Sequence, residues 1–231
     1  MKISVNCPSY KRGDDVKTLS YLPFCRVWVD CGEYDEYKRN YPEADIISCP
    51  EGVQGNLCRI RNYILDEEFK RGMDVVLIID DDFTCLRRFD YVASENWGYE
   101  PYIITADEFL TVIEKYSIIA SDMGAKFWGV NCNKDMMAYR HCSPFSTRAY
   151  IGGPFQAFLK GNRCRYDESL PLKEDYDMTL QQMNLERVVL RVNAYHYTCR
   201  QSTMRGGARH TGTETRKGSN YTPCKGSGAA R

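Results

Sequence analysis

The sequence predicts an α/β fold in which a mostly parallel, Rossmann-like sheet is flanked by helices. In the first half of the chain, short strand-like segments alternate with helical ones, a pattern typical of parallel βαβ units. The aliphatic run at residues 75–79 (VVLII) is short, continuous and rich in Val and Ile, as expected for a strand buried on both faces of such a sheet. The second half mixes strands with loops, so we expect the sheet to be mixed there.

Each expected strand is a short β-branched or aromatic segment that stops at a turn residue or at the next helix. The strands are predicted at residues 3–7, 24–30, 44–49, 75–79, 126–131, 150–160 and 188–194. Helices are predicted at residues 33–40, from the capping residue Asn56 to Gly72, from the capping box at 105–108, and at 174–187. The last of these is expected to turn Tyr176, Leu180 and Met183 inward.

Composition indicates one large domain with a tail. The chain has 231 residues, of which 43% are hydrophobic, so it can bury a sizeable core. The 31 basic and 31 acidic residues cancel, which gives no overall attraction to nucleic acid or membrane. Residues 200–231, however, hold Lys or Arg at seven positions against the single acid Glu214. We expect a domain at 1–199 and a basic Gly/Thr/Arg-rich tail that is flexible or becomes ordered when a ligand binds.

The cysteines and the hydrophobic pattern indicate a cytoplasmic protein, in the host cytoplasm if the source is viral. Eleven Cys are scattered without a Cys-x-x-Cys pair, which favours reduced thiols over a disulfide framework. A structural zinc site built from distant Cys is the less favoured alternative. We find neither a signal peptide nor a transmembrane run, and therefore expect no membrane partner. The oligomeric state cannot be predicted.

The acid triplet Asp80-Asp81-Asp82 closes the aliphatic strand. Three neighbouring carboxylates repel one another unless they are paired, and Mg²⁺ or Mn²⁺ prefers such oxygens while leaving positions open for phosphates. In an extended backbone Asp80 and Asp82 would share a face, while Asp81 would point toward the sheet or a helix. Since open α/β sheets bind ligands at their carboxyl edge, the triplet predicts a metal and phosphate site. The alternative is a capped strand-to-loop turn.

A second acidic cluster, at residues 173–177, begins the last predicted helix. Asp175 is our first choice for a general base that takes a proton from an acceptor hydroxyl, and Asp177 is the second. Helix capping explains the same acids without function. His196 follows the last predicted strand and is either a second metal ligand or a structural histidine.

Three further residues are candidates for the site on their sequence pattern. Arg61 lies beside the apolar stripe of its helix, where it could pair with Asp80 or a phosphate, or form an ordinary surface ion pair. Gly152 and Gly153 would let the backbone approach a sugar or nucleotide, although a plain bulge has the same pattern. The chain has neither a Walker-type loop nor a Gly-x-Gly-x-x-Gly motif, which argues against a P-loop NTPase and a nicotinamide enzyme.

In this order, the motifs resemble the GT-A class of nucleotide-sugar glycosyltransferases. The matching segments are residues 7–12 (CPSYKR), Arg61-Asn62, the acid triplet, Gly152-Gly153, Glu174-Asp175 and His196. The resemblance implies that Asp82 and His196 hold Mn²⁺ or Mg²⁺, that Asp80 contacts metal or ribose, and that Asp175 is the base. It further implies that Pro8, Ser9 and Tyr10 line the nucleotide pocket, with Arg12 or Arg61 nearby and Glu174 and the glycines facing the substrates.

Within that class, the segments VLIIDDDFTCLRR and KEDYDMTLQQM are similar to the TET-associated glycosyltransferases of bacteriophages. Those enzymes are thought to glycosylate 5-hydroxymethyl-pyrimidines in DNA. The resemblance implies a metal-dependent, inverting transfer from a nucleotide-sugar, UDP-linked, to a hydroxyl, with 5-hydroxymethylcytosine in phage DNA as the candidate acceptor. The alternatives are a nucleotidyltransferase that uses an NTP and Mg²⁺, and a non-catalytic nucleic-acid-binding module.

Overall fold

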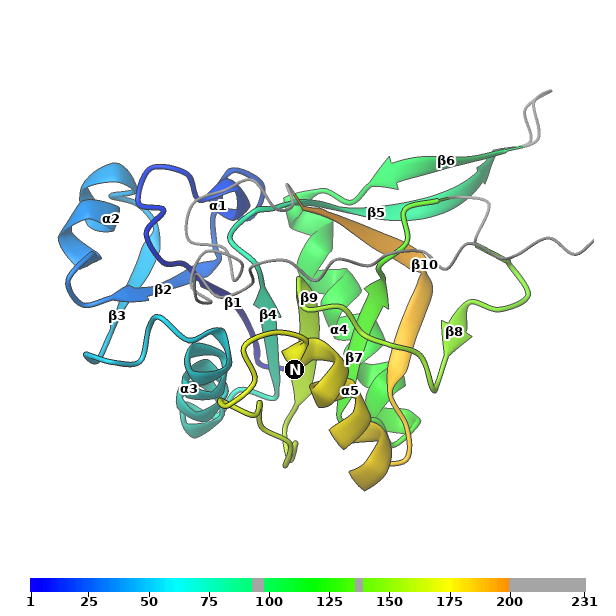
Figure 1. Ribbon diagram of the computed structural model, residues 1–231. Coiled ribbons are helices and arrows are strands. Elements are labelled where there is room, and N and C mark those ends of the chain that lie inside the picture. The colour runs from blue at the N-terminus through cyan, green and yellow to red at the C-terminus, as the bar shows by residue number, and fades with distance from the viewer. Residues whose placement is uncertain (93–97, 136–138, 200–231) are drawn as a thin grey trace, which may run out of the picture.

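The computed structural model describes residues 1–92, 98–135 and 139–199, which form one open sheet with helices on both faces (Figure 1). Within these residues the sheet has ten strands in the order β3-β2-β1-β4-β9-β7-β10-β5-β6, and β8 pairs with β10. All the strands run in one direction except β5, β8 and β9. The predicted fold class, a mostly parallel sheet with a mixed second half, is therefore confirmed.

The parallel half comes from the first 79 residues. Its strands are β1 (Ile3–Pro8), β2 (Arg26–Asp30), β3 (Asp45–Cys49) and β4 (Val75–Ile79). Its helices are α1 (Lys17–Tyr21), α2 (Tyr34–Asn40) and α3 (Leu57–Lys70). Asn56 caps α3 by accepting from the Arg59 amide at 3.0 Å, as its position before the apolar stripe predicts.

The mixed half is joined to the parallel half through β9, which pairs antiparallel with β4. Its strands are β5 (Phe83–Val92), β6 (Gly98–Ile103), β7 (Phe127–Asn131), β8 (Phe145–Ser146), β9 (Phe155–Leu159) and β10 (Leu190–Cys199). Its helices are α4 (Ala106–Asp122), which opens with the predicted capping box of Thr105 and Glu108, and α5 (Glu174–Leu185). Figure 1 shows β5 and β6 as a long antiparallel ribbon at the edge of the sheet.

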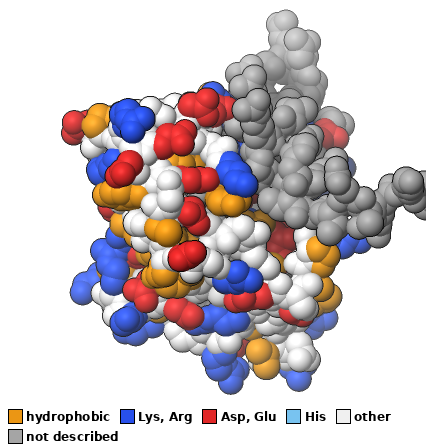
Figure 2. Space-filling view, turned by 60° about the vertical axis from the view of Figure 1, so that its left-hand side comes forward, with side chains coloured by type: hydrophobic (Ala, Val, Ile, Leu, Met, Phe, Trp, Pro, Cys, Tyr) orange, Lys and Arg blue, Asp and Glu red, His pale blue; other side chains and the backbone are white. Residues whose placement is uncertain are grey.

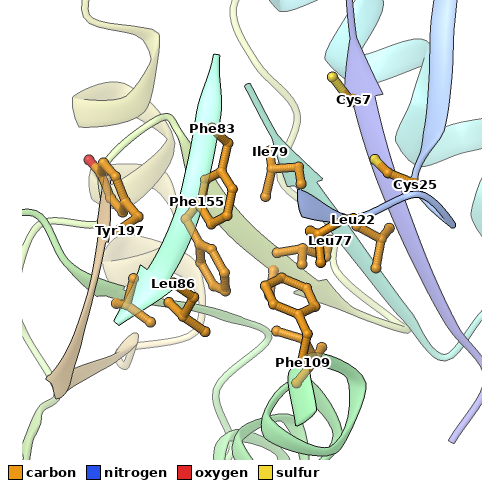
Figure 3. Close-up of a cluster of buried hydrophobic side chains, with 14 of the residues drawn as sticks. Cys7, Leu22, Cys25, Leu77, Ile79, Phe83, Leu86, Phe109, Phe155 and Tyr197 are labelled. Atoms are coloured by element: carbon orange, nitrogen blue, oxygen red, sulfur yellow. The ribbon is translucent and has the colours of Figure 1, made fainter. Parts of the chain in front are cut away.

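The sheet has a hydrophobic core on each face, and β4 contributes to both. Leu77 and Ile79 pack with Phe109 of α4 and Phe155 of β9 on one face (Figure 3). Val76 and Ile78 pack on the opposite face, with apolar residues of α3 and α5. Alternate side chains of a strand point to opposite faces, so the continuous aliphatic run is what a strand covered on both sides requires.

Several elements differ from the sequence prediction, which included neither α1 nor β8. The strands β5 and β6 were not predicted, because their charged and aromatic residues lack a continuous aliphatic run. The inward face predicted for α5 was wrong for two of its three residues: Tyr176 and Leu180 are 53% and 61% exposed, whereas Met183 is partly buried and packs against the core. The buried residues of this helix are Met178, Thr179 and Gln182. The apolar stripe of α5 faces solvent because its polar residues bond to the sheet and loops beneath. Gln182, for example, donates to Asn162 at 2.6 Å.

Candidate functional site at the carboxyl edge of the sheet

The predicted site residues gather where β1 and β4 end. Ser9 follows β1 and the acid triplet follows β4. Because β9 is antiparallel to β4, with Phe155 opposite Ile79, Gly152 and Gly153 reach the same edge just before β9 begins. The first turn of α5 brings Glu174 and Asp175 there through contacts with Arg61 and Gly153. Residues far apart in sequence thus meet at the edge where open α/β sheets bind ligands.

Asp81 is the structural member of the triplet. It is 6% exposed, accepts a hydrogen bond from Ser9 Oγ at 2.8 Å, and forms an ion pair with Arg12. Burial raises the pKa of Asp81 to about 7, although Arg12 and Ser9 pull it down. Ser9 also contacts the Tyr37 hydroxyl, at 2.9 Å. Asp81 therefore ties the end of β4 to the loop after β1. The sequence analysis had instead expected its carboxylate to contact the sheet or a helix.

Asp80 and Asp82 do not lie on an extended backbone, contrary to our expectation. The Phe83 amide donates to the Asp80 carbonyl at 3.2 Å, so residues 80–83 form a turn. Thr18 of α1 supports this turn by donating its hydroxyl to the same carbonyl at 2.6 Å. The two carboxylates still influence each other, since burial and then the charge of Asp80 raise the pKa of Asp82 to about 6. The Cys199 thiol, at the end of β10, has the opposite effect and lowers the pKa of Asp82.

Arg61 is the buried centre of the site, with only 1% of its side chain exposed. Its Nη2 donates to Asp80 Oδ1 at 2.8 Å and to the Gly153 carbonyl at 3.2 Å, while Nη1 donates to Glu174 Oε1 at 3.0 Å. The guanidinium also lies over the Tyr166 ring, 5.6 Å from its centroid. Burial disfavours the charge, but the surrounding acids and Tyr166 outweigh it and raise the pKa of Arg61. The predicted contact between Arg61 and Asp80 is confirmed.

Asp175 is held by three donors. The Tyr150 hydroxyl and the Gly153 amide both donate to Oδ2, the latter at 3.2 Å, and the Tyr176 amide donates to Oδ1 at 2.9 Å. The neighbouring acid of the cluster, Asp177, instead accepts from Gln181 one turn later on α5, at 2.6 Å. The contact with Gly153 brings Asp175 to the glycine segment that also binds Arg61, whereas Gln181, the partner of Asp177, lies on its own helix.

The two glycines occupy different environments. A Cβ on Gly152 would lie 2.5 Å from the Tyr197 hydroxyl oxygen and 2.6 Å from Cys132 Sγ, so an added side chain would force these groups to shift. A Cβ on Gly153 would lie 3.5 Å from both Nη atoms of Arg61 and from Asp175 Oδ2, which is ordinary contact. Gly152 thus permits close packing behind the site. Gly153 uses its carbonyl and amide to join Arg61 to Asp175.

His196 lies within β10, which extends beyond the predicted strand to Cys199. It is 2% exposed, and its ring stacks on Phe89 with centroids 4.7 Å apart. Burial lowers the pKa of His196, and Nε2 is buried without a hydrogen-bond partner. In the described part of the chain, no group of three or more His, Cys, Asp or Glu side chains is arranged to hold a metal ion. The predicted metal-binding role of His196 stays a prediction.

Sequence reasoning missed the residues that support this site from outside the motifs. Tyr150 stands two positions before Gly152 in a segment that was recognised, but nothing in a lone tyrosine marks it as a partner of Asp175. Thr18 belongs to α1, a five-residue helix too short to show periodicity. Tyr166 and Cys199 reach the site only through the tertiary fold. Pro8, the last residue of β1, and Tyr10 flank Ser9 in the chain, and their contact with a nucleotide stays a prediction.

The family of the chain follows from its sequence match. A family model described as TET-Associated Glycosyltransferase matches residues 4–207. The chain belongs to this family. The match covers most of the chain and includes every candidate site residue described above.

One solved structure supports the fold. The structure of S. aureus TarS 1–349 in complex with UDP-GlcNAc is similar, with a TM-score of 0.51 and 16% identity over 87% of this TET-associated glycosyltransferase chain and 60% of the TarS chain. The chain therefore spans less than two thirds of that structure. At this identity, the likeness supports a shared GT-A fold.

Other matches are more distant. The structure of A197 from STIV has a TM-score of 0.44 and 12% identity over 87% of each chain. The structure of mannose-1-phosphate geranyltransferase from Thermus thermophilus has a TM-score of 0.43 and 12% identity over 86% of this chain and 75% of that one. No curated protein matches the chain.

Proposed function

We propose that this chain is a metal-dependent glycosyltransferase that moves a sugar from a UDP-linked donor to a hydroxyl, with inversion at the sugar carbon. The proposed acceptor is 5-hydroxymethylcytosine in phage DNA. Membership of the TET-associated glycosyltransferase family supports the reaction class. The TarS structure was solved with UDP-GlcNAc, which supports the choice of a UDP-sugar as the first donor to test.

One observation carries the proposal: Arg61 bridges the two acidic clusters. It contacts Asp80 at the end of β4 and Glu174 at the start of α5, and the Gly153 backbone then links it to Asp175. A transferase needs a donor-binding end and an acceptor-activating base held in fixed relation, because the reaction depends on alignment. The buried Arg61 side chain supplies that fixed relation between the two clusters.

Asp80 and Asp82 suit a divalent cation. They are neighbouring carboxylates on a turn, and burial and then the charge of Asp80 raise the pKa of Asp82. Arg61 pairs with Asp80, and a bound cation would offset the remaining repulsion between the two carboxylates. Oxygen donors of this kind are those that Mg²⁺ and Mn²⁺ prefer. When bound, such an ion would neutralise the leaving diphosphate as a Lewis acid. We propose Asp80 and Asp82 as ligands, with His196 as the further ligand that the family resemblance implies.

On the acceptor side, we propose that Asp175 takes the proton of the attacking hydroxyl. Its carboxylate is oriented by backbone amides of Gly153 and Tyr176, which fixes the direction from which a hydroxyl can approach. Ser9, with Pro8 and Tyr10 beside it, would line the nucleotide pocket. Arg12 would support that loop through Asp81.

The proposed function is tested first by donor binding. UDP, UDP-GlcNAc and other nucleotide-sugars are compared with NTPs in a thermal-shift panel, with Mn²⁺ or with EDTA. A ligand present at about 100 times its Kd stabilises the folded state by roughly 2.7 kcal/mol. We expect stabilisation by a nucleotide-sugar that needs Mn²⁺. Stabilisation by NTPs alone would favour a nucleotidyltransferase, and no shift with any nucleotide would remove the proposal.

The base is tested by Asp175→Asn, with Asp177→Asn as the matched control on the same helix turn. General bases typically contribute about 10²–10⁴-fold to rate, so we expect Asp175→Asn to lower transfer by at least about 100-fold with donor binding retained. Asp177→Asn should keep most activity. Full transfer by a folded Asp175→Asn variant would exclude Asp175 as the base. A binding module without turnover would show no transfer in any variant or in the wild type.

A further inference from the structure

The hydrogen bonds of Asp175 leave one acceptor position open. A carboxylate offers about four lone-pair positions, two on each oxygen. The Tyr150 hydroxyl and the Gly153 amide use both positions on Oδ2, whereas Oδ1 accepts only the Tyr176 amide among the described residues. A substrate hydroxyl can therefore donate to Oδ1 without displacing a protein group. Tyr150 keeps its proton for this contact, because burial and then the bond to Asp175 raise its pKa.

Tyr150 is itself held by an aromatic neighbour. Its ring stacks on Tyr176 with centroids 4.1 Å apart and an interplanar angle of 18°. Tyr150 is partly buried, but Tyr176 is 53% exposed, so Tyr150 covers one face of the Tyr176 ring and leaves the side chain accessible elsewhere. Tyr176 therefore presents an exposed aromatic ring and also donates its backbone amide to Asp175 Oδ1, the oxygen that has an open acceptor position.

Exposed cations flank this pair of rings in the chain. Arg148 lies two residues before Tyr150, and Lys173 lies immediately before α5. Both are exposed, and neither is ion-paired in the described part of the chain. Acids adjoin Tyr176 in the chain as well, at Glu174, Asp175 and Asp177, and over the face shown in Figure 2 basic and acidic side chains are likewise interspersed. The exposed ring of Tyr176 is therefore the main feature that suits a nucleobase, because bases of single-stranded nucleic acid stack on aromatic side chains, while Arg148 and Lys173 are candidates for phosphate contacts.

We propose that Tyr150 and Tyr176 form the acceptor subsite, in which Tyr176 stacks on the nucleobase that carries the hydroxyl and Tyr150 positions Asp175 so that Oδ1 receives the proton. This inference rests on the proposed function and names the residues that would select a planar acceptor. Tyr176 is a specificity-determining residue, because a linear alcohol would gain nothing from its ring. Tyr150 is a positioning residue, since it acts through Asp175.

The stacking role is tested by binding alone, which requires neither donor nor turnover. Fluorescence anisotropy measures the Kd of a single-stranded oligonucleotide that contains one 5-hydroxymethylcytosine. We expect Tyr176→Ala to weaken binding roughly tenfold or more, as the loss of one base–aromatic stack does, and Tyr176→Phe to bind within about twofold of wild type. The matched control is Leu180→Ala, on the same exposed side of α5 one turn later, which should leave Kd unchanged. Equal Kd values for Tyr176→Ala and wild type, or no binding by wild type, would overturn the proposal.

The positioning role is tested by Tyr150→Phe, which keeps the ring and removes the hydroxyl. With the nucleotide-sugar that stabilises the protein most, we expect kcat to fall about tenfold while the KM for the oligonucleotide stays the same. A fall in kcat at constant KM is what a group that orients the base produces, whereas general damage to the fold would also change the KM for the oligonucleotide. A kcat equal to that of wild type would show that Tyr150 does not position Asp175.

The two levels fail in different ways. If no nucleotide-sugar stabilises the protein, the proposed function fails, and the anisotropy result still decides whether Tyr176 stacks on a base. If nucleotide-sugars bind and transfer occurs but the variants at Tyr150 and Tyr176 behave like wild type, the function stands and the acceptor subsite lies elsewhere.

Discussion

Helix α3 carries two buried charges, one directed to each end of the sheet. Arg61 meets Asp80 and Glu174 at the carboxyl edge. Glu68, two turns later, is fully buried and accepts from Arg26 at 2.6 Å and from Arg71 at 2.8 Å, close to where β2 begins. The clusters have similar chemistry, since each centres on one buried ion with two partners of opposite charge. They differ in whether a ligand can reach the partners of the buried ion.

The partners of Arg61 belong to the site, and those of Glu68 belong to the scaffold. Asp80 is 29% exposed and is the first acid of the triplet that closes β4, so a ligand can reach it. Arg26 instead forms a second ion pair, with Asp45 of β3, at 2.9 Å. A buried ion pair is therefore weak evidence for function by itself. Its position at the carboxyl ends of the strands is what distinguishes Arg61.

The largest effect is expected from a substitution that removes Arg61, the centre of the cluster at the carboxyl edge. Arg61→Met leaves Asp80 and Glu174 without their shared cation, and breaking a buried ion pair typically costs about 3–5 kcal/mol. We expect urea unfolding to show a loss of that size and sugar transfer to fall below detection. Arg61→Lys keeps the charge but cannot donate to both acids in a fork, so it should recover part of the stability with little transfer. Wild-type transfer by Arg61→Met would remove the bridge from the mechanism.

A smaller effect separates packing from site contact within the glycine pair. The added methyl of Gly152→Ala would lie 2.5 Å from the Tyr197 hydroxyl oxygen, and we expect a loss of about 1–3 kcal/mol in unfolding free energy, as overpacked cores show. Gly153→Ala places its methyl in ordinary contact with Arg61 and should change stability by about 0.5 kcal/mol or less. If the two variants unfolded alike, the close packing at Gly152 would not constrain the fold.

The sequence predicted what local pattern encodes. The aliphatic run of β4 and the caps at Asn56 and Thr105 act over a few residues, and the structure has them where the pattern placed them. The contact between Arg61 and Asp80 was predictable because the two ends of a βαβ unit have limited freedom. The predictions that failed concern contacts between residues that are distant in sequence. The turn at Asp80 needs Thr18 of α1.

Helix α5 shows the same limit more clearly. Its apolar stripe predicted an inward face through Tyr176 and Leu180, which the structure exposes. Hydrophobic periodicity does not show that the polar residues on the other side of the helix form hydrogen bonds with buried groups. Gln182 and Thr179 on that side bond to Asn162 and to the Ile151 amide. Burying a polar group without a partner costs more than exposing one apolar side chain, so the polar contacts decide the orientation.

The smallest expected effect concerns Glu68, the centre of the cluster at the opposite edge. Burial raises the pKa of Glu68 despite the opposing pull of Arg26. A carboxyl whose pKa is higher in the folded state binds more protons there than in the unfolded chain, so wild-type stability contains a term that falls as pH rises above about 4.3, the usual Glu value. Glu68→Gln lacks this term. The amide can still accept from both arginines, and we expect its stability at pH 7 to lie within about 1 kcal/mol of wild type.

The comparison is made as the difference in unfolding free energy between Glu68→Gln and wild type, measured by urea denaturation from pH 4 to pH 8. That difference should move in favour of the variant as pH rises, while donor binding and transfer stay at the wild-type level because Glu68 lies away from the carboxyl edge. A variant that lost stability relative to wild type with rising pH would mean that Arg26 and Arg71 more than offset the burial of the carboxylate. Lost transfer in a stable Glu68→Gln protein would show that the two ends of α3 are coupled and that position at the carboxyl edge does not alone separate site from scaffold.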